Sequence, residues 1–240
     1  SQRVLGEGEL AARMPSVIGY WMGCLCLFYF VRRRTTALYG FLAIAFALSS
    51  SFAYRYAFEA RPYAVMFGFG ALALVCWQSA AENRKRPAAI AGLALALLAG
   101  VYSHYYAILL VCPIAVGEFV RILRLRRIDW PVWLALVPSF APLAFAELGT
   151  NLSRYGANFW SAPRPSFFFV FYERMLQSLL LPVAFLLVIL ALYYALRIGT
   201  REDGKPFALA PPVYEVAAVT ALAGLPVFGT LRDLIDTGDK

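Results

Sequence analysis

Residues 62–80 read PYAVMFGFGALALVCWQSA, and this stretch decides the class of protein. It contains no Asp, Glu, Lys or Arg over a length close to the ~20 residues that cross the hydrocarbon core of a bilayer as a helix. Charged residues stand on both sides of it, with Glu59 and Arg61 before and Arg84-Lys85-Arg86 after. A charge-free apolar stretch with charged flanks predicts a membrane-spanning helix.

The rest of the chain has the same character. Of its 240 residues, 61% are hydrophobic and 15% are charged, and the mean hydropathy is +0.66. A soluble domain has about 45–50% apolar and about 25% charged residues, so this chain has too few polar groups to cover itself in water. The net charge of +8 would suggest nucleic-acid binding in a soluble protein. Here the basic residues form short clusters between apolar runs, so we expect membrane lipids and no nucleic acid as partners.

Eight apolar runs can be drawn along the chain. They cover residues 14–31, 36–53, 62–80, 88–103, 105–121, 130–149, 175–196 and 212–230. The fourth and fifth are short and nearly continuous, but together they are too long for one span. The polar residues 1–10 before the first run are expected to form a loop. We predict an all-α, polytopic transmembrane bundle of about eight spans, with residues 1–240 forming a single transmembrane domain.

Positive charge alternates between the loops of this topology. If the first run enters from outside, the basic loops 32–34, 84–86, 121–127 and 197–205 all face the cytoplasm, and they hold more than half of the 22 Lys and Arg residues. Glu118, Glu147 and Glu215 fall near span ends, where a carboxylate can reach the headgroup region. No carboxylate lies clearly at mid-span, which argues against a pump or an ion-coupled transporter.

The opposite face carries few charges, and they lie close to helix ends. Arg61 stands at the expected start of a helix, where the macrodipole disfavours a cation. Two interpretations follow. In the simpler one, Glu59 neutralises Arg61 in a local ion pair. In the other, an anionic ligand such as a phosphate is held by Arg61 and the helix N-terminus together.

His104 is the only histidine of the chain and lies in the sequence Tyr102-Ser103-His104-Tyr105-Tyr106. A tyrosine-rich turn next to a span is typical of the aromatic belt at a membrane interface. A histidine there can be an anchor in that belt, a metal ligand or a proton carrier. The residues themselves leave these three roles open.

Three stretches on this face carry a family resemblance. They are Gly6-Glu7-Gly8-Glu9-Leu10-Ala11-Ala12-Arg13-Met14-Pro15-Ser16, then Tyr54-Arg55-Tyr56-Ala57-Phe58-Glu59-Ala60-Arg61-Pro62-Tyr63-Ala64, and Tyr102-Ser103-His104-Tyr105. In order and spacing they resemble the GT-C superfamily of polyprenyl-phosphate-sugar-dependent glycosyltransferases. The closest group is the bacterial branch related to protein O-mannosyltransferases and lipid A aminoarabinose transferases.

The resemblance implies a multi-pass enzyme of the inner (plasma) membrane that works on the periplasmic or extracellular face. It would move a sugar from a polyprenyl-phosphate donor to a hydroxyl of a lipid, glycan or protein acceptor, in one inverting step. Arg13 resembles the family's basic residue near the donor phosphate, and Arg55 and Arg61 are further candidates. Glu59, Tyr63 and His104 would support them. A divalent metal ion is a further candidate, and Glu59 and His104 would then bind it. We identify no other cofactor.

The chain also departs from the family pattern. Members are usually much longer, and a large first outer loop carries the acidic residue that acts in catalysis. The resemblance therefore places the general base before Ser1, and we expect the chain to be a fragment that is inactive alone. The competing class is a non-enzymatic membrane protein, such as a transporter or a flippase-like carrier of lipid-linked sugars, which would also hold a lipid phosphate with arginines. A structural membrane subunit is a third interpretation.

Overall fold

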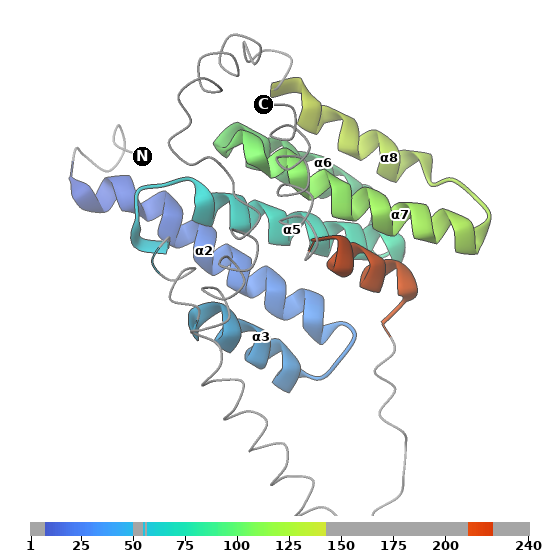
Figure 1. Ribbon diagram of the computed structural model, residues 1–240, viewed down its shortest axis with the longest axis horizontal. Helices are drawn as coiled ribbons and strands as arrows, with labels where there is room; N and C mark the ends of the chain where they lie inside the picture. Colours follow the sequence, from blue (N-terminus) through green and yellow to red (C-terminus); the bar gives the residue numbers. More distant parts are fainter. Residues whose placement is uncertain (1–7, 50–54, 56, 143–210, 223–240) are drawn as a thin grey trace, which may run out of the picture.

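Helices with nearly parallel axes make up the computed structural model, which describes residues 8–49, 55, 57–142 and 211–222 (Figure 1). In chain order they are α2 (Glu9–Arg32), α3 (Ala37–Ser49), α5 (Tyr63–Ala81), α6 (Arg86–Ser103), η1 (Tyr105–Leu110), α7 (Val111–Leu125), α8 (Trp130–Leu136) and η2 (Val137–Phe140). A further helix covers Val213–Leu222. Within the described ranges every regular element is helical, as predicted.

Four segments are long and apolar enough to cross a membrane: Glu9–Arg32, Tyr63–Ala81, Arg86–Ser103 and Tyr105–Leu125. Three shorter apolar helices, Ala37–Ser49, Trp130–Phe140 and Val213–Leu222, fall in three more of the expected runs. The run at 175–196 lies outside the described residues. The structure therefore supports a multi-pass membrane protein with four candidate spans in the described part, and the total of eight stays a prediction.

The first helix begins earlier than expected. α2 starts at Glu9, so the expected loop is wrong at Glu9 and Leu10. Glu9 lies in the first turn, where a carboxylate complements the helix dipole, and it pairs with Arg13 one turn later. Pro15 lies inside α2 without ending it. A packed transmembrane helix tolerates the one hydrogen bond that a proline removes.

The fourth and fifth runs form two helices, as their combined length required. The backbone is extended at His104 (φ −161°, ψ 127°), which ends α6 before η1 and α7 begin. Arg86 at the start of α6 and Arg121 near the end of α7 both bind Asp129. The two helices therefore run antiparallel, side by side.

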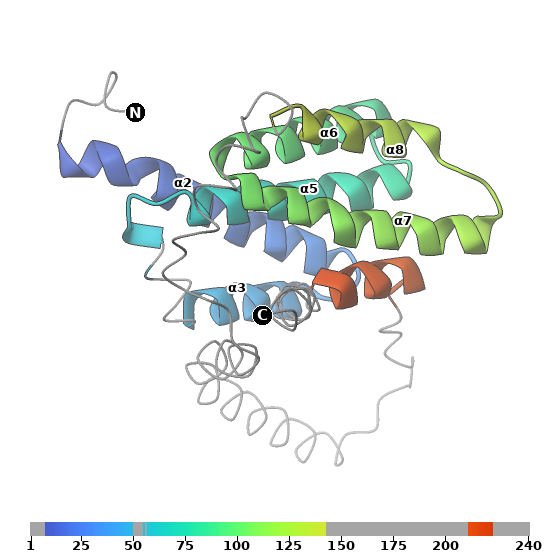
Figure 2. The same ribbon diagram turned by 45° about the horizontal axis from the view of Figure 1, so that its top comes forward.

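Small residues allow α2 and α5 to approach closely. A Cβ atom on Gly19 of α2 would lie 2.6 Å from the Cα atom of Val65 in α5, and one on Gly68 would meet the carbonyl oxygen of Gly19. Such contacts are typical of helix pairs in membranes, where packing replaces the hydrophobic effect. α5 thus packs between α2 and α6, and α3 covers the other side of α2 (Figures 1 and 2).

The other face of α5 contributes Trp77 to the main core, where it is fully buried with Leu93 and Ile114. Trp77 also donates its Nε1–H to Glu118 at 2.6 Å, and Glu118 accepts from buried Arg121. Glu118 is 0% exposed, so the expectation that it reaches the headgroup region is wrong. Its charge is satisfied inside the bundle because Arg121 lies one turn away.

Glu215 differs from expectation in the same way. It is 2% exposed and accepts bonds from Arg34, with Nε 2.9 Å from Oε2, and from Gln78 at 3.2 Å. These contacts hold the helix Val213–Leu222 against the ends of α2 and α5 (Figure 2). Both buried carboxylates thus belong to the end of the bundle that carries the basic loops 32–34, 84–86 and 121–127.

Candidate functional site

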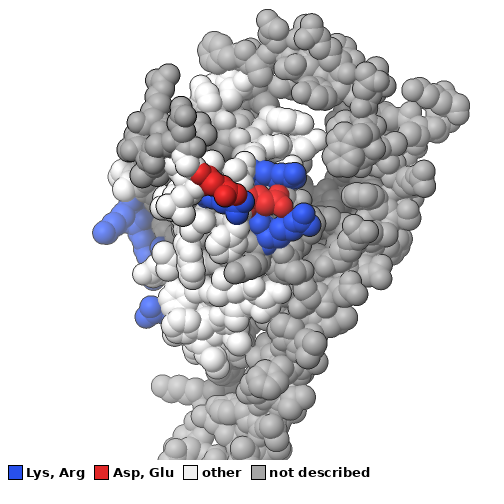
Figure 3. All heavy atoms as spheres, turned by 90° about the vertical axis from the view of Figure 1, so that its left-hand side faces the viewer, with Lys and Arg blue, Asp and Glu red and all other residues white. Residues whose placement is uncertain are grey.

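A hollow of about 390 Å³ opens at the other end of the bundle. Its lining comes from the first turns of α2 and from the segment just before α5, namely Glu9, Ala12, Arg13, Glu59, Ala60 and Arg61. The two alanines have small side chains that leave the hollow open, and the four charged side chains surround it. Figure 3 shows this end of the molecule, with acidic side chains flanked by basic ones. The structure therefore joins two of the three stretches that carried the family resemblance.

Glu59 is the centre of the basic group. Its Oε1 accepts a hydrogen bond from Nε of Arg55 at 2.9 Å, and its Oε2 lies 3.2 Å from Nε of Arg61 without hydrogen-bond geometry. The local ion pair expected between Glu59 and Arg61 is confirmed. Glu59 also reaches Arg55, which the sequence did not indicate, and so holds two guanidinium groups near each other.

The three arginines remain accessible despite these pairs. The exposed fractions of their side chains are 48% for Arg13, 59% for Arg61 and 78% for Arg55. Ion pairs at such exposure contribute only about 0–1 kcal/mol. The guanidinium groups can therefore turn from their glutamates toward an incoming anion at little cost, and a phosphate accepts the paired donors of arginine well.

Ser16 is a site residue that sequence reasoning did not identify. It is buried in α2, and its hydroxyl donates to the backbone carbonyl of Arg61 at 2.9 Å. This bond fixes the segment before α5 to α2. Ser16 closes the first quoted stretch, Gly6 to Ser16, but nothing in the sequence points to a partner 45 positions away.

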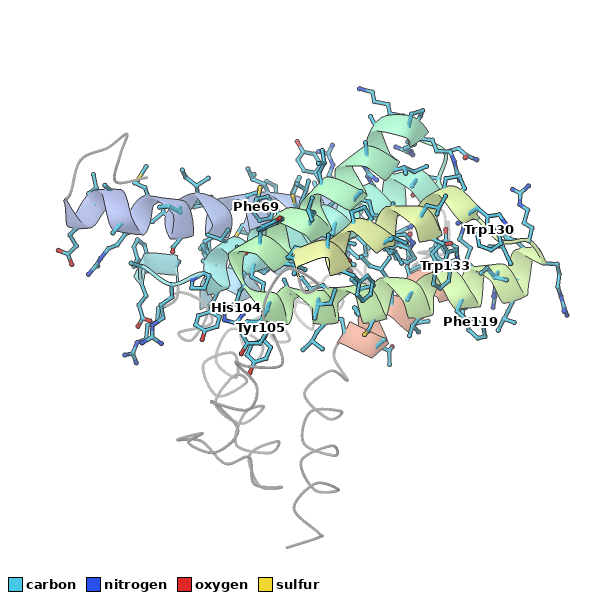
Figure 4. All side chains as sticks on the ribbon, turned by 90° about the horizontal axis from the view of Figure 1, so that it is seen from above. Phe69, His104, Tyr105, Phe119, Trp130 and Trp133 are labelled. Atoms are coloured by element: carbon cyan, nitrogen blue, oxygen red, sulfur yellow. The ribbon has the colours of Figure 1, made fainter. Side chains whose placement is uncertain are left out.

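Tyr63 and His104 lie at the same end of the bundle. The ring of Tyr63, at the start of α5, has its centroid 5.5 Å from that of His104. Tyr105 stacks on His104 at 4.9 Å with an interplanar angle of 17°, and Figure 4 shows these two together at the end of α6. The third quoted stretch is thereby joined to the second through an aromatic contact.

The protonation of His104 follows from its contacts. Its Nδ1 accepts the backbone N–H of Tyr106 at 3.2 Å, so in the neutral ring the proton is on Nε2. Burial among the tyrosines lowers the pKa of His104 below its ordinary value. His104 is therefore a neutral ring at physiological pH, with its Nε2–H available as a donor.

The metal interpretation finds no further support in these contacts. Within the described ranges, no three side chains of His, Cys, Asp or Glu lie together so as to hold a metal ion. Glu59 faces two arginines, a setting that disfavours a cation, and Nδ1 of His104 already has a donor. We assign no metal here, and metal-ligand roles for Glu59 and His104 stay predictions.

Comparison with known proteins agrees with the family resemblance of these stretches. The family model described as dolichyl-phosphate-mannose-protein mannosyltransferase matches residues 1–145, a range that includes Arg13, Arg55, Glu59, Arg61 and His104. No curated protein and no solved structure matches the chain. The match covers more than half of the 240 residues. The chain therefore belongs to the dolichyl-phosphate-mannose-protein mannosyltransferase family.

Proposed function

We propose that the hollow between α2 and the start of α5 binds the phosphate of a polyprenyl-phosphate mannose donor. In this proposal the protein transfers the mannose to a hydroxyl of a protein acceptor. The observation that carries the proposal is that Arg13 and Arg61, which are far apart in the sequence, line the same hollow. The family supplies the donor and acceptor classes, because its name states both.

The chemistry asks for positive charge at this position. When the acceptor oxygen attacks the anomeric carbon, the bond to the phosphate breaks and its electron pair moves onto the phosphate oxygen. Arginines directed at that oxygen stabilise the charge as it develops, which lowers the barrier. Arg13 and Arg61 would contact the phosphate, and Arg55 would add charge from the rim. The attack inverts the anomeric carbon, and a carboxylate removes the proton of the acceptor.

The proposed face of the membrane follows from charge. The hollow lies at the end of the bundle away from the loops 32–34, 84–86 and 121–127, which are rich in arginine. By the positive-inside rule those loops are cytoplasmic. The hollow would then open on the periplasmic or extracellular side of the plasma membrane.

A transfer assay tests the proposal. Membranes that express the longest reading frame containing this chain are given labelled polyprenyl-phosphate mannose and an acceptor peptide. We expect Arg61→Ala to lower kcat/KM about 10²–10³-fold, the range for loss of one group that stabilises developing charge. Arg61→Lys should lose less, because the charge remains but the paired donors do not.

Arg84→Ala is the matched control. Arg84 is exposed and pairs with Glu82 at the other end of the bundle, so its loss should leave transfer unchanged. Normal transfer by Arg61→Ala at equal protein level would contradict the proposed phosphate site. Movement of the labelled donor across vesicles without any mannosylated peptide would favour the carrier over the transferase.

A further inference from the structure

A second hollow of about 390 Å³ lies at the opposite end of the bundle from the proposed donor site. It is formed where the start of α6, the end of α7 and the start of α8 meet. Arg86, Arg121, Arg127, Asp129, Ile128 and Trp130 are among its lining residues. Neither the family assignment nor the proposed transfer reaction gives this hollow a role.

Asp129 builds the inner wall of the hollow. Its Oδ2 accepts from Nη1 and Nη2 of Arg121 at 2.8 and 2.9 Å, and its Oδ1 accepts from Nη2 of Arg86. Arg121 is only 6% exposed and has a second carboxylate partner in Glu118. The wall is thus held rigid by a network that is buried, with both guanidinium planes fixed in place.

Positive charge exceeds negative charge in the lining. Three arginines face one carboxylate there. Among the described residues Arg127 makes no ion pair, and it lies exposed at the rim. The neighbouring Arg124 and Arg126 are also exposed, and Arg126 ends α7 in the left-handed conformation (φ 55°). Asp129 neutralises part of the charge of Arg86 and Arg121, but Arg127 at the rim has no counter-ion among the described residues, a setting that attracts an anion.

Apolar side chains border the same rim. Leu125, Ile128 and Trp130 are 50%, 48% and 62% exposed, and Trp130 stands at the start of α8 (Figure 4). An exposed tryptophan beside arginines is typical of the level of the lipid headgroups, where the ring contacts both acyl chain and water. A soluble anion would have no use for these groups, whereas a phospholipid would occupy both the charged and the apolar parts.

The geometry points to a binding site for an anionic phospholipid, with its phosphate in the hollow between Arg86, Arg121 and Arg127 and its acyl chains against Leu125, Ile128 and Trp130. The positive-inside orientation would place this site in the cytoplasmic leaflet, where anionic lipids gather at basic juxtamembrane segments. The site is independent of the proposed donor site, because no residue is shared between the two hollows.

Lipid binding by the purified full chain tests the inference. Native mass spectrometry from detergent counts bound phosphatidylglycerol, with phosphatidylcholine as the neutral lipid, for wild type, Arg127→Gln and Arg124→Gln. We expect phosphatidylglycerol to bind better than phosphatidylcholine, and Arg127→Gln to bind phosphatidylglycerol about fivefold more weakly, the effect of about one basic contact at a membrane surface. Arg124→Gln removes another exposed arginine of the same turn, one that does not line the hollow, and should bind as wild type does.

The other outcomes would overturn the site. Equal losses in Arg127→Gln and Arg124→Gln would show attraction by the general charge of the turn, and equal binding of the two lipids would show no headgroup selection. A competition experiment with inorganic phosphate distinguishes a lipid from a free anion. If it displaces phosphatidylglycerol at millimolar concentration, the ligand is a free phosphate and not a lipid. The lipid-binding measurement does not involve mannose transfer. A negative result in it would therefore leave the proposed function unaffected, and a negative transfer assay would leave the lipid site unaffected.

Discussion

Ser16 controls the position of Arg61 from a neighbouring helix. Its hydroxyl donates to the carbonyl of Arg61 at 2.9 Å, and Ser16 itself is buried. In Ser16→Ala that carbonyl loses its donor, and the loss of a typical hydrogen bond costs about 0.5–1.5 kcal/mol. We expect a lower thermal unfolding midpoint in detergent and a raised KM for the donor with kcat little changed, because Arg61 is misplaced but still present.

Thr35→Val is the control for this change. Thr35 donates its hydroxyl to the carbonyl of Val31 within its own turn, at the opposite end of the bundle. We expect Thr35→Val to leave the KM for the donor unchanged, whereas Ser16→Ala raises it if Ser16 acts through Arg61. A Ser16→Ala enzyme with an unchanged KM would show that the bond to Arg61 serves stability alone.

His104 links pH to stability at the donor end. Burial lowers its pKa, so the folded chain favours the neutral ring more than the unfolded chain does. Below about pH 6.5, the ordinary pKa of histidine, the unfolded state binds more protons, and stability falls as the pH falls toward the lowered pKa. His104→Asn keeps a side-chain acceptor for the N–H of Tyr106 but cannot titrate.

We therefore expect the unfolding midpoint of wild type to fall between pH 7 and pH 5 more steeply than that of His104→Asn. As His104 is the only histidine, the difference between the two curves isolates its titration. Parallel curves would mean that the ring is protonated equally in both states.

The residues of the site differ in how well the sequence could predict them. The ion pair of Glu59 and Arg61 was predictable because the two are close in sequence and a cation at a helix start needs a partner. That Arg13 faces the same hollow followed only from the family resemblance. The role of Ser16 could not be predicted, because the local sequence around a serine in an apolar helix does not indicate which distant carbonyl accepts its hydrogen bond.

The spacing of the helices α2 and α5 sets the distance between the two halves of the proposed donor site. Gly19 meets the backbone of α5, so a methyl group there must push two helices apart, and overpacking of this kind costs about 1–3 kcal/mol. We expect Gly19→Ala to lower the unfolding midpoint and to raise KM for the donor, since Arg13 and Arg61 then separate.

Gly100→Ala is the matched control for Gly19→Ala. In α6 an added Cβ would lie 3.5 Å from Ala107 and 3.6 Å from Phe69, which are ordinary contacts. This variant should be neutral or more stable, because alanine favours a helix over glycine by about 1 kcal/mol. If both variants behaved alike, the close approach of α2 and α5 would not be what sets the site.

Helix positions were mostly predictable, and their partners were not. Hydropathy placed α5 and α6 to within a few residues, and Pro87 and Pro131 stand in the first turns where a proline is tolerated. The start of α2 was missed because Glu9 and Arg13 look like loop residues until their pairing across one turn is considered. Which faces meet could not be read, because helices with apolar residues all round show no preferred side.

The two ends of the bundle differ in how their charged side chains are paired. The donor end has exposed pairs around Glu59, which can rearrange for a ligand. The other end has buried networks around Asp129 and Glu215, which lock α6, α7 and the helix Val213–Leu222 to the rest. The sequence predicted the separation of charge, but it could not show that the ion pairs are exposed at one end and largely buried at the other.

The Asp129 network gives the last prediction. Burial is the largest influence and raises the pKa of Asp129, but hydrogen bonds and charge from Arg86 and Arg121 together outweigh it, so the pKa lies below its ordinary value. The folded chain thus favours the carboxylate, and this stability is present above about pH 4 and lost as the pH falls through the lowered pKa.

Asp129→Asn leaves Arg121 with one buried partner fewer, and breaking such a pair costs about 3–5 kcal/mol. We expect a much lower unfolding midpoint at pH 7 and a flatter dependence on acid than wild type shows. Glu9→Gln, which removes an exposed carboxylate at the donor end, should change neither. Among the described residues, Ser16 and Asp129 share no hydrogen-bond partner, so the losses of Asp129→Asn and Ser16→Ala should add in the double variant. A clear departure from additivity would show that the two ends are coupled through α5.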